Sequence, residues 1–268
     1  MKAVIAIAGC KNSGKSSLCR YLTYLIARVD GLILNDKLAG SFDNRLLAQV
    51  PKDASQKVYI TDNGRNYVEA KLKRDPNVET ISFAGPIKDF CINVLDIDYN
   101  SIYGSDEQKN LTTKYVWENM PEHIKNSYGS FKSGQMTARE IMQILGTDIF
   151  RNYFSQSVWV DCLISRIKKS DADVIFVDDL RFNNEAISLM KEDAMIIHLA
   201  RMWGQGGSHK SENGLDLSLF TGYPHFYSIP DVDIMSKNDI AFKATRKYFE
   251  NVLRKQDELS EQVQTQTA

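Results

Sequence analysis

The feature that most constrains this chain is a glycine-bracketed loop directly after its first apolar segment. Gly9 is followed by four residues and then by Gly14-Lys15-Ser16, the spacing G-x-x-x-x-G-K-[ST], or Walker A motif. Residues 3–8 before the loop are apolar, and residues 17–27 after it have helical spacing of their apolar side chains. A strand that runs through such a loop into a helix can hold phosphate oxygens on backbone N–H groups. The sequence therefore predicts a phosphate-binding loop rather than an incidental glycine turn.

Each residue type in this loop has an expected role. Lys15 is expected to reach the β- and γ-phosphates of a nucleotide, and the Ser16 hydroxyl to ligate Mg²⁺. The loop therefore predicts a nucleotide with β- and γ-phosphates, together with Mg²⁺; the resemblance described below implies that this nucleotide is ATP. The predicted ATP-binding residues are Gly9, Asn12, Ser13, Gly14, Lys15, Ser16 and Ser17.

Further apolar segments predict strands that alternate with helical patterns. They cover residues 79–83, 173–177, 194–200 and 232–235. Strands that alternate with helices favour a parallel sheet covered on both faces. We therefore expect an α/β fold, a P-loop kinase sandwich of three layers with a mostly parallel five-stranded sheet.

The expected domain spans residues 1–255 and contains two irregular segments. About fifty residues separate the first helix from the second strand, and they include a hairpin-turn signal at Asp62-Asn63-Gly64. This predicts an inserted segment at about 31–77, either a hairpin packed on the edge of the core or a dimer surface. Residues 202–214 are rich in glycine and serine, which suits a lid-like loop. Residues 256–268 are almost free of apolar side chains, and we expect a frayed helix end and a disordered tail.

Composition narrows the class of protein. The formal net charge of −1 gives no support for a nucleic-acid partner through bulk charge. The cysteines, Cys10, Cys19, Cys91 and Cys162, form no C-x-x-C pair, which indicates a reducing cytosol. No apolar run approaches the roughly 20 residues of a membrane helix. We therefore expect a cytoplasmic protein that binds small molecules, with neither a membrane nor a stable nucleic-acid partner.

A second segment, residues 137–161, combines a helix start with basic side chains. Thr137 and Glu140 form a capping box. In a helix that begins there, one stripe at four-residue spacing contains Arg139, Gln143, Thr147 and Arg151. Guanidinium groups on such a stripe suit a phosphate. Gly146 costs about 1 kcal/mol relative to alanine inside a helix, which the close approach of a ligand would explain. A solvated arginine face with a tolerated glycine is the alternative.

Acidic and basic side chains also follow the predicted strand at 173–177. Asp178 and Asp179 come at its end, followed by Arg181 and Glu185. In open parallel sheets, ligands bind beyond the carboxyl ends of the strands. The acids could hold Mg²⁺ through water or accept from a substrate, and Arg181 could bridge phosphates. The alternative is that Asp179 only caps the next helix.

Taken in order, the segments FAGPIKD, REIMQILGTD, WVD, VDDLRFNNE and HKSENGL after the phosphate loop resemble those of the deoxynucleoside monophosphate kinases of large tailed bacteriophages. The resemblance extends from residue 1 to about 253, apart from the insertion. It implies a nucleoside monophosphate kinase-like fold, a homodimer, and transfer of a phosphoryl group from ATP to a deoxynucleoside monophosphate. The products would be the deoxynucleoside diphosphate and ADP.

The resemblance also implies acceptor-binding residues at the matching positions. They are Lys88, Asp89, Arg139, Gly146, Thr147, Arg151, Trp159, Asp179, Arg181 and Glu185. Trp159 is expected to help wall the pocket against the base or sugar. Phosphoryl transfer mainly needs positioning and charge neutralisation, which assigns catalytic roles to Lys15, Arg139, Arg151 and Arg181.

Other functions remain open at this level. A P-loop kinase of another small acceptor, such as a coenzyme precursor, would need the same loop. A nucleotide-switch or DNA-handling NTPase is a second alternative, because SKND at 236–239 is similar to the guanine-reading N-K-x-D. No D-x-x-G follows Asp178, however. The intact Gly14-Lys15-Ser16 argues against a binding protein without turnover.

Overall fold

The computed structural model describes residues 2–10, 13–26, 77–129, 132–200 and 215–267. Contacts divide the chain into two compact units. The sheet unit comprises residues 1–82 and 164–268, and the helical unit comprises residues 83–163. Asn12, the lid-like loop at 202–214 and the insertion up to residue 76 lie outside the described residues.

Within the described part of the sheet unit, five strands form an all-parallel sheet in the order β2-β5-β1-β6-β7. The strands are β1 (Ala3–Gly9), β2 (Val78–Ile81), β5 (Val174–Leu180), β6 (Met195–Leu199) and β7 (Phe226–Ile229). This confirms the predicted α/β class. Because β1 is the central strand, the phosphate loop at its carboxyl end lies between the ends of β5 and β6.

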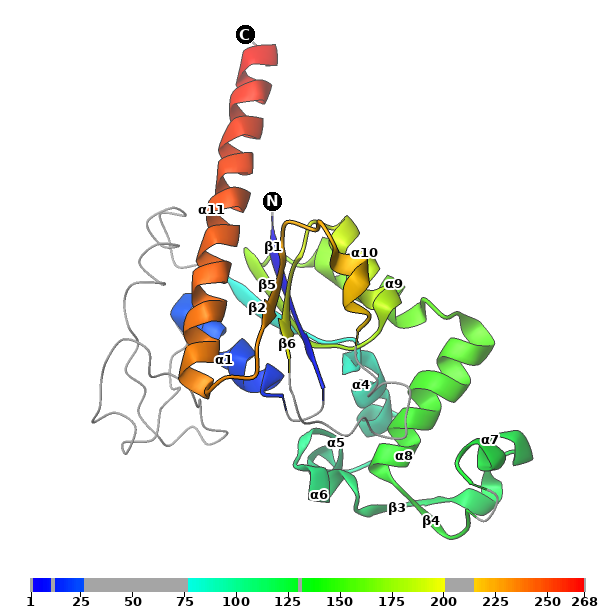
Figure 1. Ribbon diagram of the computed structural model, residues 1–268. Coiled ribbons are helices and arrows are strands. Elements are labelled where there is room, and N and C mark those ends of the chain that lie inside the picture. Colours follow the sequence, from blue (N-terminus) through cyan, green and yellow to red (C-terminus); the bar gives the residue numbers. More distant parts are fainter. Residues whose placement is uncertain (1, 11–12, 27–76, 130–131, 201–214, 268) are drawn as a thin grey trace. The chain divides into compact units, whose positions relative to one another are not determined.

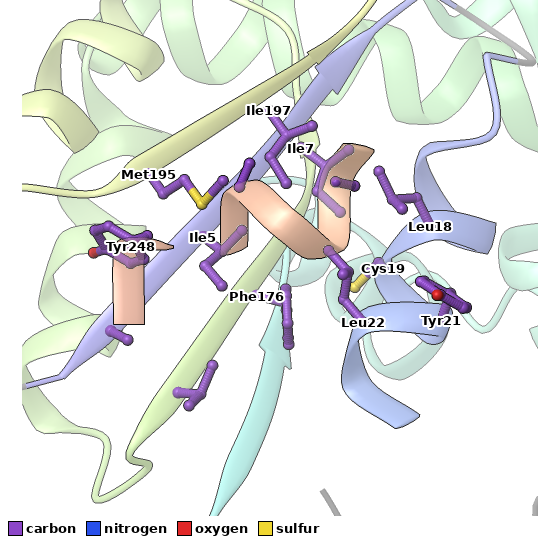
Figure 2. Close-up of a cluster of buried hydrophobic side chains, with 14 of the residues drawn as sticks. Ile5, Ile7, Leu18, Cys19, Tyr21, Leu22, Phe176, Met195, Ile197 and Tyr248 are labelled. Carbon is purple, nitrogen blue, oxygen red and sulfur yellow. The ribbon is translucent and has the colours of Figure 1, made fainter. Parts of the chain in front are cut away.

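The central strands are buried on both faces, as their continuous apolar sequence predicts. Alternate side chains such as Ile5, Phe176 and Met195 point to one face and pack on α1 (Lys15–Ile26) and α11 (Ile234–Thr267) (Figure 2). The opposite face of the sheet carries α10 (Asn183–Lys191), which buries Ala186 and Leu189 (Figure 1). Helices on both faces of the sheet give the three layers expected.

The assignment of residues 232–235 as the fifth strand is wrong. The strand is β7, which ends directly before Pro230, and α11 begins at Ile234. Proline lacks the N–H that a central strand needs, and Asp233 is a capping residue. Its carboxylate accepts from the backbone N–H of Ser236 at 3.0 Å. A short apolar run cannot distinguish a strand from the first turn of a helix.

Helix α11 also differs from expectation at its other end. The backbone is helical as far as Thr267, where we predicted a frayed end and a disordered tail from residue 256. The segment holds neither glycine nor proline, and its glutamines, glutamates and leucine are good helix formers. Low apolar content was therefore no guide to the backbone of this segment.

The helical unit consists of short elements. They are α4 (Gly85–Asn93), α5 (Tyr99–Tyr103), α6 (Asp106–Lys109), β3 (Thr112–Val116), a 3-10 turn (Trp117–Asn119), α7 (Glu122–Ser127), β4 (Gln135–Thr137), α8 (Ala138–Gln143), a π-helix (Ile144–Phe154) and the start of α9 (Val158–Lys169). Strands β3 and β4 pair antiparallel, a small sheet that the sequence did not reveal. The described residues include no helix long and apolar enough to cross a membrane.

The predicted capping box is confirmed at the start of α8. The Thr137 hydroxyl accepts from the Glu140 N–H at 3.2 Å, and the Glu140 carboxylate accepts from the Thr137 N–H at 2.8 Å. The continuous α-helical stripe predicted after it is wrong, because α8 gives way to the π-helix at Ile144. In the wider i→i+5 helix, residues at four-residue spacing no longer stay in line.

Candidate functional site

The two motif glycines of the loop are needed for different reasons. Gly9 has φ +149°, and a Cβ there would lie 2.9 Å from the Leu199 carbonyl oxygen and 2.6 Å from Ser13 Oγ. The backbone of β6 therefore leaves no room for a side chain. Gly14 has φ +92° with open space around it, so only its backbone conformation requires glycine.

Lys15 closes the loop from the start of α1. Its Nζ donates to the carbonyl oxygens of Gly9 and Cys10, each at 2.7 Å. Burial, followed by the positive charge of Arg181, lowers the pKa of Lys15 to about 8, while Cys10 and the two aspartates oppose this shift. The ammonium group is thus partly desolvated and held by two neutral acceptors. An anionic phosphate would be a stronger partner for it.

A pocket of about 190 Å³ adjoins the loop. Its lining residues are Ser13, Gly14, Ser17, Leu18, Leu199, Lys237 and Asn238. The buried Ser13 Oγ has no hydrogen-bond partner among the described residues. Buried polar atoms are normally satisfied, so this one fits a ligand oxygen. The sequence analysis missed Lys237 and Asn238 as pocket residues. They belong to the SKND segment, which had been considered only as the mark of a nucleotide switch.

The predicted acidic cluster lies at the same edge of the sheet as Lys15. Asp178 and Asp179 are the two residues before Leu180, the last residue of β5, which pairs with β1. Their charges act on Lys15, as does the charge of Arg181. The parallel register therefore brings these four side chains into electrostatic range, as expected for the carboxyl ends of neighbouring strands. Such a group can neutralise phosphates and orient a hydrated cation.

Glu185 has a definite structural role beside this cluster. It is only 2% exposed, and its Oε2 accepts from the backbone N–H groups of Arg181 and Phe182, each at 3.0 Å. These bonds close the turn from β5 into α10. Glu185 therefore does the capping that the alternative interpretation gave to Asp179.

In the helical unit, Lys88 and Asp89 meet around one tyrosine. Lys88 Nζ lies 4.7 Å from the centre of the Tyr103 ring, and the Tyr103 hydroxyl donates to Asp89 Oδ1 at 3.3 Å. Tyr99 stacks on Tyr103 with ring centres 4.8 Å apart. Both tyrosines are exposed and were not singled out in the sequence, where nothing but their aromatic character could have marked them.

The two arginines do not form the solvated face of the alternative interpretation. Arg139 Nη2 donates to Asp106 Oδ1 at 2.5 Å, and its Nε donates to Asn110 Oδ1 at 3.0 Å. Arg151 lies in the π-helix and is only 8% exposed. Carboxylate and amide partners hold the Arg139 guanidinium in a defined orientation. Both arginines are therefore ordered by the protein rather than by water alone.

Gly146 and Trp159 are bonded to each other. The Trp159 Nε1–H donates to the Gly146 carbonyl oxygen at 2.8 Å, and the indole is 7% exposed. A Cβ at Gly146 would lie 2.9 Å from Ile87 Cδ1. Ile87 of α4 therefore packs directly over Gly146, and a side chain at this position would require the end of the Ile87 side chain to shift. Thr147, half-buried, follows it in the π-helix.

The structure brings the predicted residues together in two sets. Lys15, Asp179 and Arg181 lie in the sheet unit, and Lys88, Arg139, Arg151 and Trp159 lie in the helical unit. No group of three or more histidine, cysteine, aspartate or glutamate side chains in the described residues could hold a metal ion by itself.

A parallel sheet whose central strand leads into a glycine loop, with a lysine and a serine at the helix start, defines the class of P-loop nucleotide-binding proteins. Comparison with known families narrows this class. Residues 3–219 match the deoxynucleotide monophosphate kinase family, and the chain belongs to that family. The family expected from the resemblance is confirmed.

A kinase from a bacteriophage is also similar to this chain. The chain is similar to the deoxynucleoside-5'-monophosphate kinase of Escherichia phage T5, with 24% identity over 136 residues. The matched region is 44% of this chain and 53% of the phage protein. The chain thus spans about half the length of this relative.

Proposed function

We propose that this protein transfers the γ-phosphoryl group of ATP to a deoxynucleoside monophosphate, giving the deoxynucleoside diphosphate and ADP. The observation that carries the proposal is Lys15, desolvated and held by carbonyl groups beside the unpartnered Ser13 Oγ. Asp179 and Arg181 act on the same lysine. Membership of the deoxynucleotide monophosphate kinase family supports this choice of acceptor.

On the donor side, Lys15 binds the β- and γ-phosphates, and the loop N–H groups surround them. The Ser16 hydroxyl would ligate Mg²⁺, and Asp178 or Asp179 would hold the ion through water. When bound, the ion neutralises charge on the phosphates during transfer. The pocket beside Ser13 and Gly14 takes the nucleoside end of ATP, which would place Lys237 and Asn238 in contact with it.

On the acceptor side, basic groups bind the monophosphate and neutralise the transferred charge. The basic groups are Lys88, Arg139, Arg151 and Arg181. The other residues proposed to form or support the acceptor site are Asp89, Gly146, Thr147, Trp159, Asp179 and Glu185. Glu185 and Gly146 contribute through backbone position, because the carboxylate caps α10 and the glycine packs on Ile87. A phosphate acceptor is already a competent nucleophile near neutral pH, so the reaction needs no strong general base.

An acceptor screen tests the proposal. Purified protein with ATP and Mg²⁺ is assayed for ADP release against each deoxynucleoside monophosphate and its ribose counterpart. We expect turnover with at least one deoxy form, and loss of turnover in Lys15→Ala with an unchanged circular dichroism spectrum. Turnover of a coenzyme precursor alone, or none of any acceptor, would contradict the proposal. Omission of Mg²⁺ tests the metal in the same assay.

The proposal includes a homodimer, which the resemblance to the phage kinases implies. Sedimentation velocity at micromolar concentration distinguishes a dimer from a monomer of 30.4 kDa.

A further inference from the structure

The helix that begins at the Thr137 cap changes form halfway along. Helix α8 ends at Gln143, and Ile144–Phe154 is a π-helix of 11 residues. π-Helical segments are rare, usually a single turn long, and frequent at functional sites. This one carries Thr147 and Arg151. Such a long departure from α-helical geometry requires tertiary contacts that favour it.

Trp159 makes two such contacts. Its Nε1–H donates to the Gly146 carbonyl oxygen at 2.8 Å, in a buried environment. Its ring packs edge-on against Phe150, with ring centres 5.0 Å apart and an angle of 61°. A side-chain donor that inserts into the helical hydrogen-bond ladder is a recognised cause of local distortion. Trp159 thus holds the π-helix at one carbonyl group and at one ring.

Helix α4 supports the π-helix as well. A Cβ at Gly146 would lie 2.9 Å from Ile87 Cδ1, so a side chain at this position would displace the end of the Ile87 side chain. Phe150 meets Phe90 edge-on with ring centres 6.2 Å apart. The same two residues, Gly146 and Phe150, therefore contact both α4 and Trp159. Trp159 thus contacts the residue directly before Thr147 and the residue directly before Arg151.

We propose that Trp159 is a positioning residue of the acceptor site. By donating to the Gly146 carbonyl oxygen it keeps Ile144–Phe154 in the π form, and this form sets the orientation of Thr147 and Arg151 toward the acceptor phosphate. The inference rests on the proposed function for its kinetic consequence. It differs from the role expected from the sequence, in which Trp159 walls the pocket against the base or sugar.

The variant Trp159→Phe tests this, because it keeps an aromatic ring and removes the N–H donor. Trp117→Phe is the control for loss of a buried indole, because the described contacts link Trp117 to the π-helix only through Tyr128, whose hydroxyl donates to Asp148 at 2.7 Å. Trp117 is a second buried tryptophan of the same unit, and its described ring contacts are with Tyr128 and Lys132. Both variants are compared with wild type in steady-state kinetics, with each substrate varied in turn, and in amide hydrogen exchange of residues 144–154.

We expect Trp159→Phe to lower kcat/KM for the acceptor by about three- to tenfold, while KM for ATP stays within about twofold. Without ligand, residues 144–154 should exchange faster in Trp159→Phe than in Trp117→Phe. An acceptor kcat/KM equal to that of Trp117→Phe, or an equal effect on ATP, would overturn the proposal, because a merely structural residue would give that result.

Two further outcomes are decided by exchange alone. Should Trp159→Phe not fold, a deoxynucleoside monophosphate added to wild type without ATP should slow exchange of residues 144–154, and unchanged exchange overturns the inference. Should wild type turn over no deoxynucleoside monophosphate, the proposed function fails. The role of Trp159 in the π-helix is then tested by hydrogen exchange of residues 144–154 in Trp159→Phe and Trp117→Phe. Equal exchange rates in the two variants would reject this role.

Discussion

The Nζ of Lys15 lies 2.7 Å from the carbonyl oxygens of Gly9 and Cys10. Burial and the positive charge of Arg181 lower the pKa of Lys15 to about 8. Near pH 8 the free protein is therefore a mixture of charged and neutral lysine. A bound phosphate favours the charged form and raises the pKa again. ATP binding should consequently take up a proton at pH values above about 8.

This coupling predicts the pH dependence of ATP binding. Between pH 7.5 and 9.5, the dissociation constant for ATP should rise by up to about tenfold per pH unit once the pH exceeds about 8. Isothermal titration calorimetry in buffers of different ionisation enthalpy measures both the affinity and the proton uptake. Lys15→Ala should bind ATP more weakly and lose the slope. A wild-type profile parallel to that of Lys15→Ala would refute the coupling.

The arginines give a second prediction at this scale. If the proposed acceptor site is correct, Arg139→Ala and Arg151→Ala should lower kcat/KM for the acceptor by about one to two decades, because each would lose a charge-assisted hydrogen bond to the acceptor phosphate. KM for ATP should change much less. Lys247→Ala on the exposed side of α11 is the control. Effects confined to ATP would assign these arginines to the donor side instead.

Among the elements, α11 connects stability with the donor pocket. Asp233 accepts from the N–H of Ser236 at 3.0 Å and from its hydroxyl at 2.6 Å, one residue before Lys237 and Asn238 line the pocket. The first turn of the helix is thus ordered by this aspartate. Residues that we propose to contact ATP depend on it.

Asp233→Ala should lower the free energy of unfolding by about 0.5–2 kcal/mol through loss of the cap. KM for ATP should rise at the same time, since Lys237 and Asn238 lose their support. Asp239→Ala removes only the exposed pair with Lys243 and should cost about 0.3–0.5 kcal/mol. Chemical denaturation compares the two variants. Equal losses in both would show that the Asp233 bonds do not stabilise the helix.

At the scale of the whole sheet unit, a buried histidine ties distant segments together. His225 is 7% exposed, and its Nε2 lies 3.4 Å from Asp193 Oδ1. Lys255 on α11 donates to Asp193 Oδ2 at 2.5 Å. The rings of Tyr223 and Tyr248 meet His225 edge-on. Burial lowers the pKa of His225; Lys255 acts in the same direction, and Asp193 opposes it.

The direction of this shift predicts lower stability in acid. Because the folded-state pKa of His225 lies below its ordinary value of 6.5, its neutral form contributes stability that is complete above pH 6.5. That contribution is lost as the pH falls through the folded-state pKa. Differential scanning calorimetry from pH 8 to 5 should show a falling Tm.

His225→Phe preserves the aromatic packing and should reduce the fall in Tm between pH 8 and pH 5. Burial also lowers the pKa of His198, so His198→Asn should remove a further part. An acid-induced fall in Tm that is unchanged in both variants would exclude the two histidines as its source.

Much of the fold follows from local patterns. The strand, loop and helix around Gly9 and Lys15 are specified by consecutive residues, so spacing alone predicts them. The other buried strands are continuous apolar runs, and three of them lie within a few residues of their predicted positions. The fifth strand was misplaced because residues 232–235 are apolar enough for either a strand or a helix start.

The sequence by itself determined the class of fold, the phosphate loop and the family, because these depend on hydrophobic periodicity and on motifs of contiguous residues. Only the tertiary structure decided the partners of the acceptor-side residues. Arg139 meets Asp106 across 33 residues of chain, and Trp159 reaches back to Gly146. The π-helix likewise depends on packing against α4 and Trp159. Contacts between residues far apart in the chain leave no periodic pattern in a single sequence. Their partners can therefore be identified only in the folded structure.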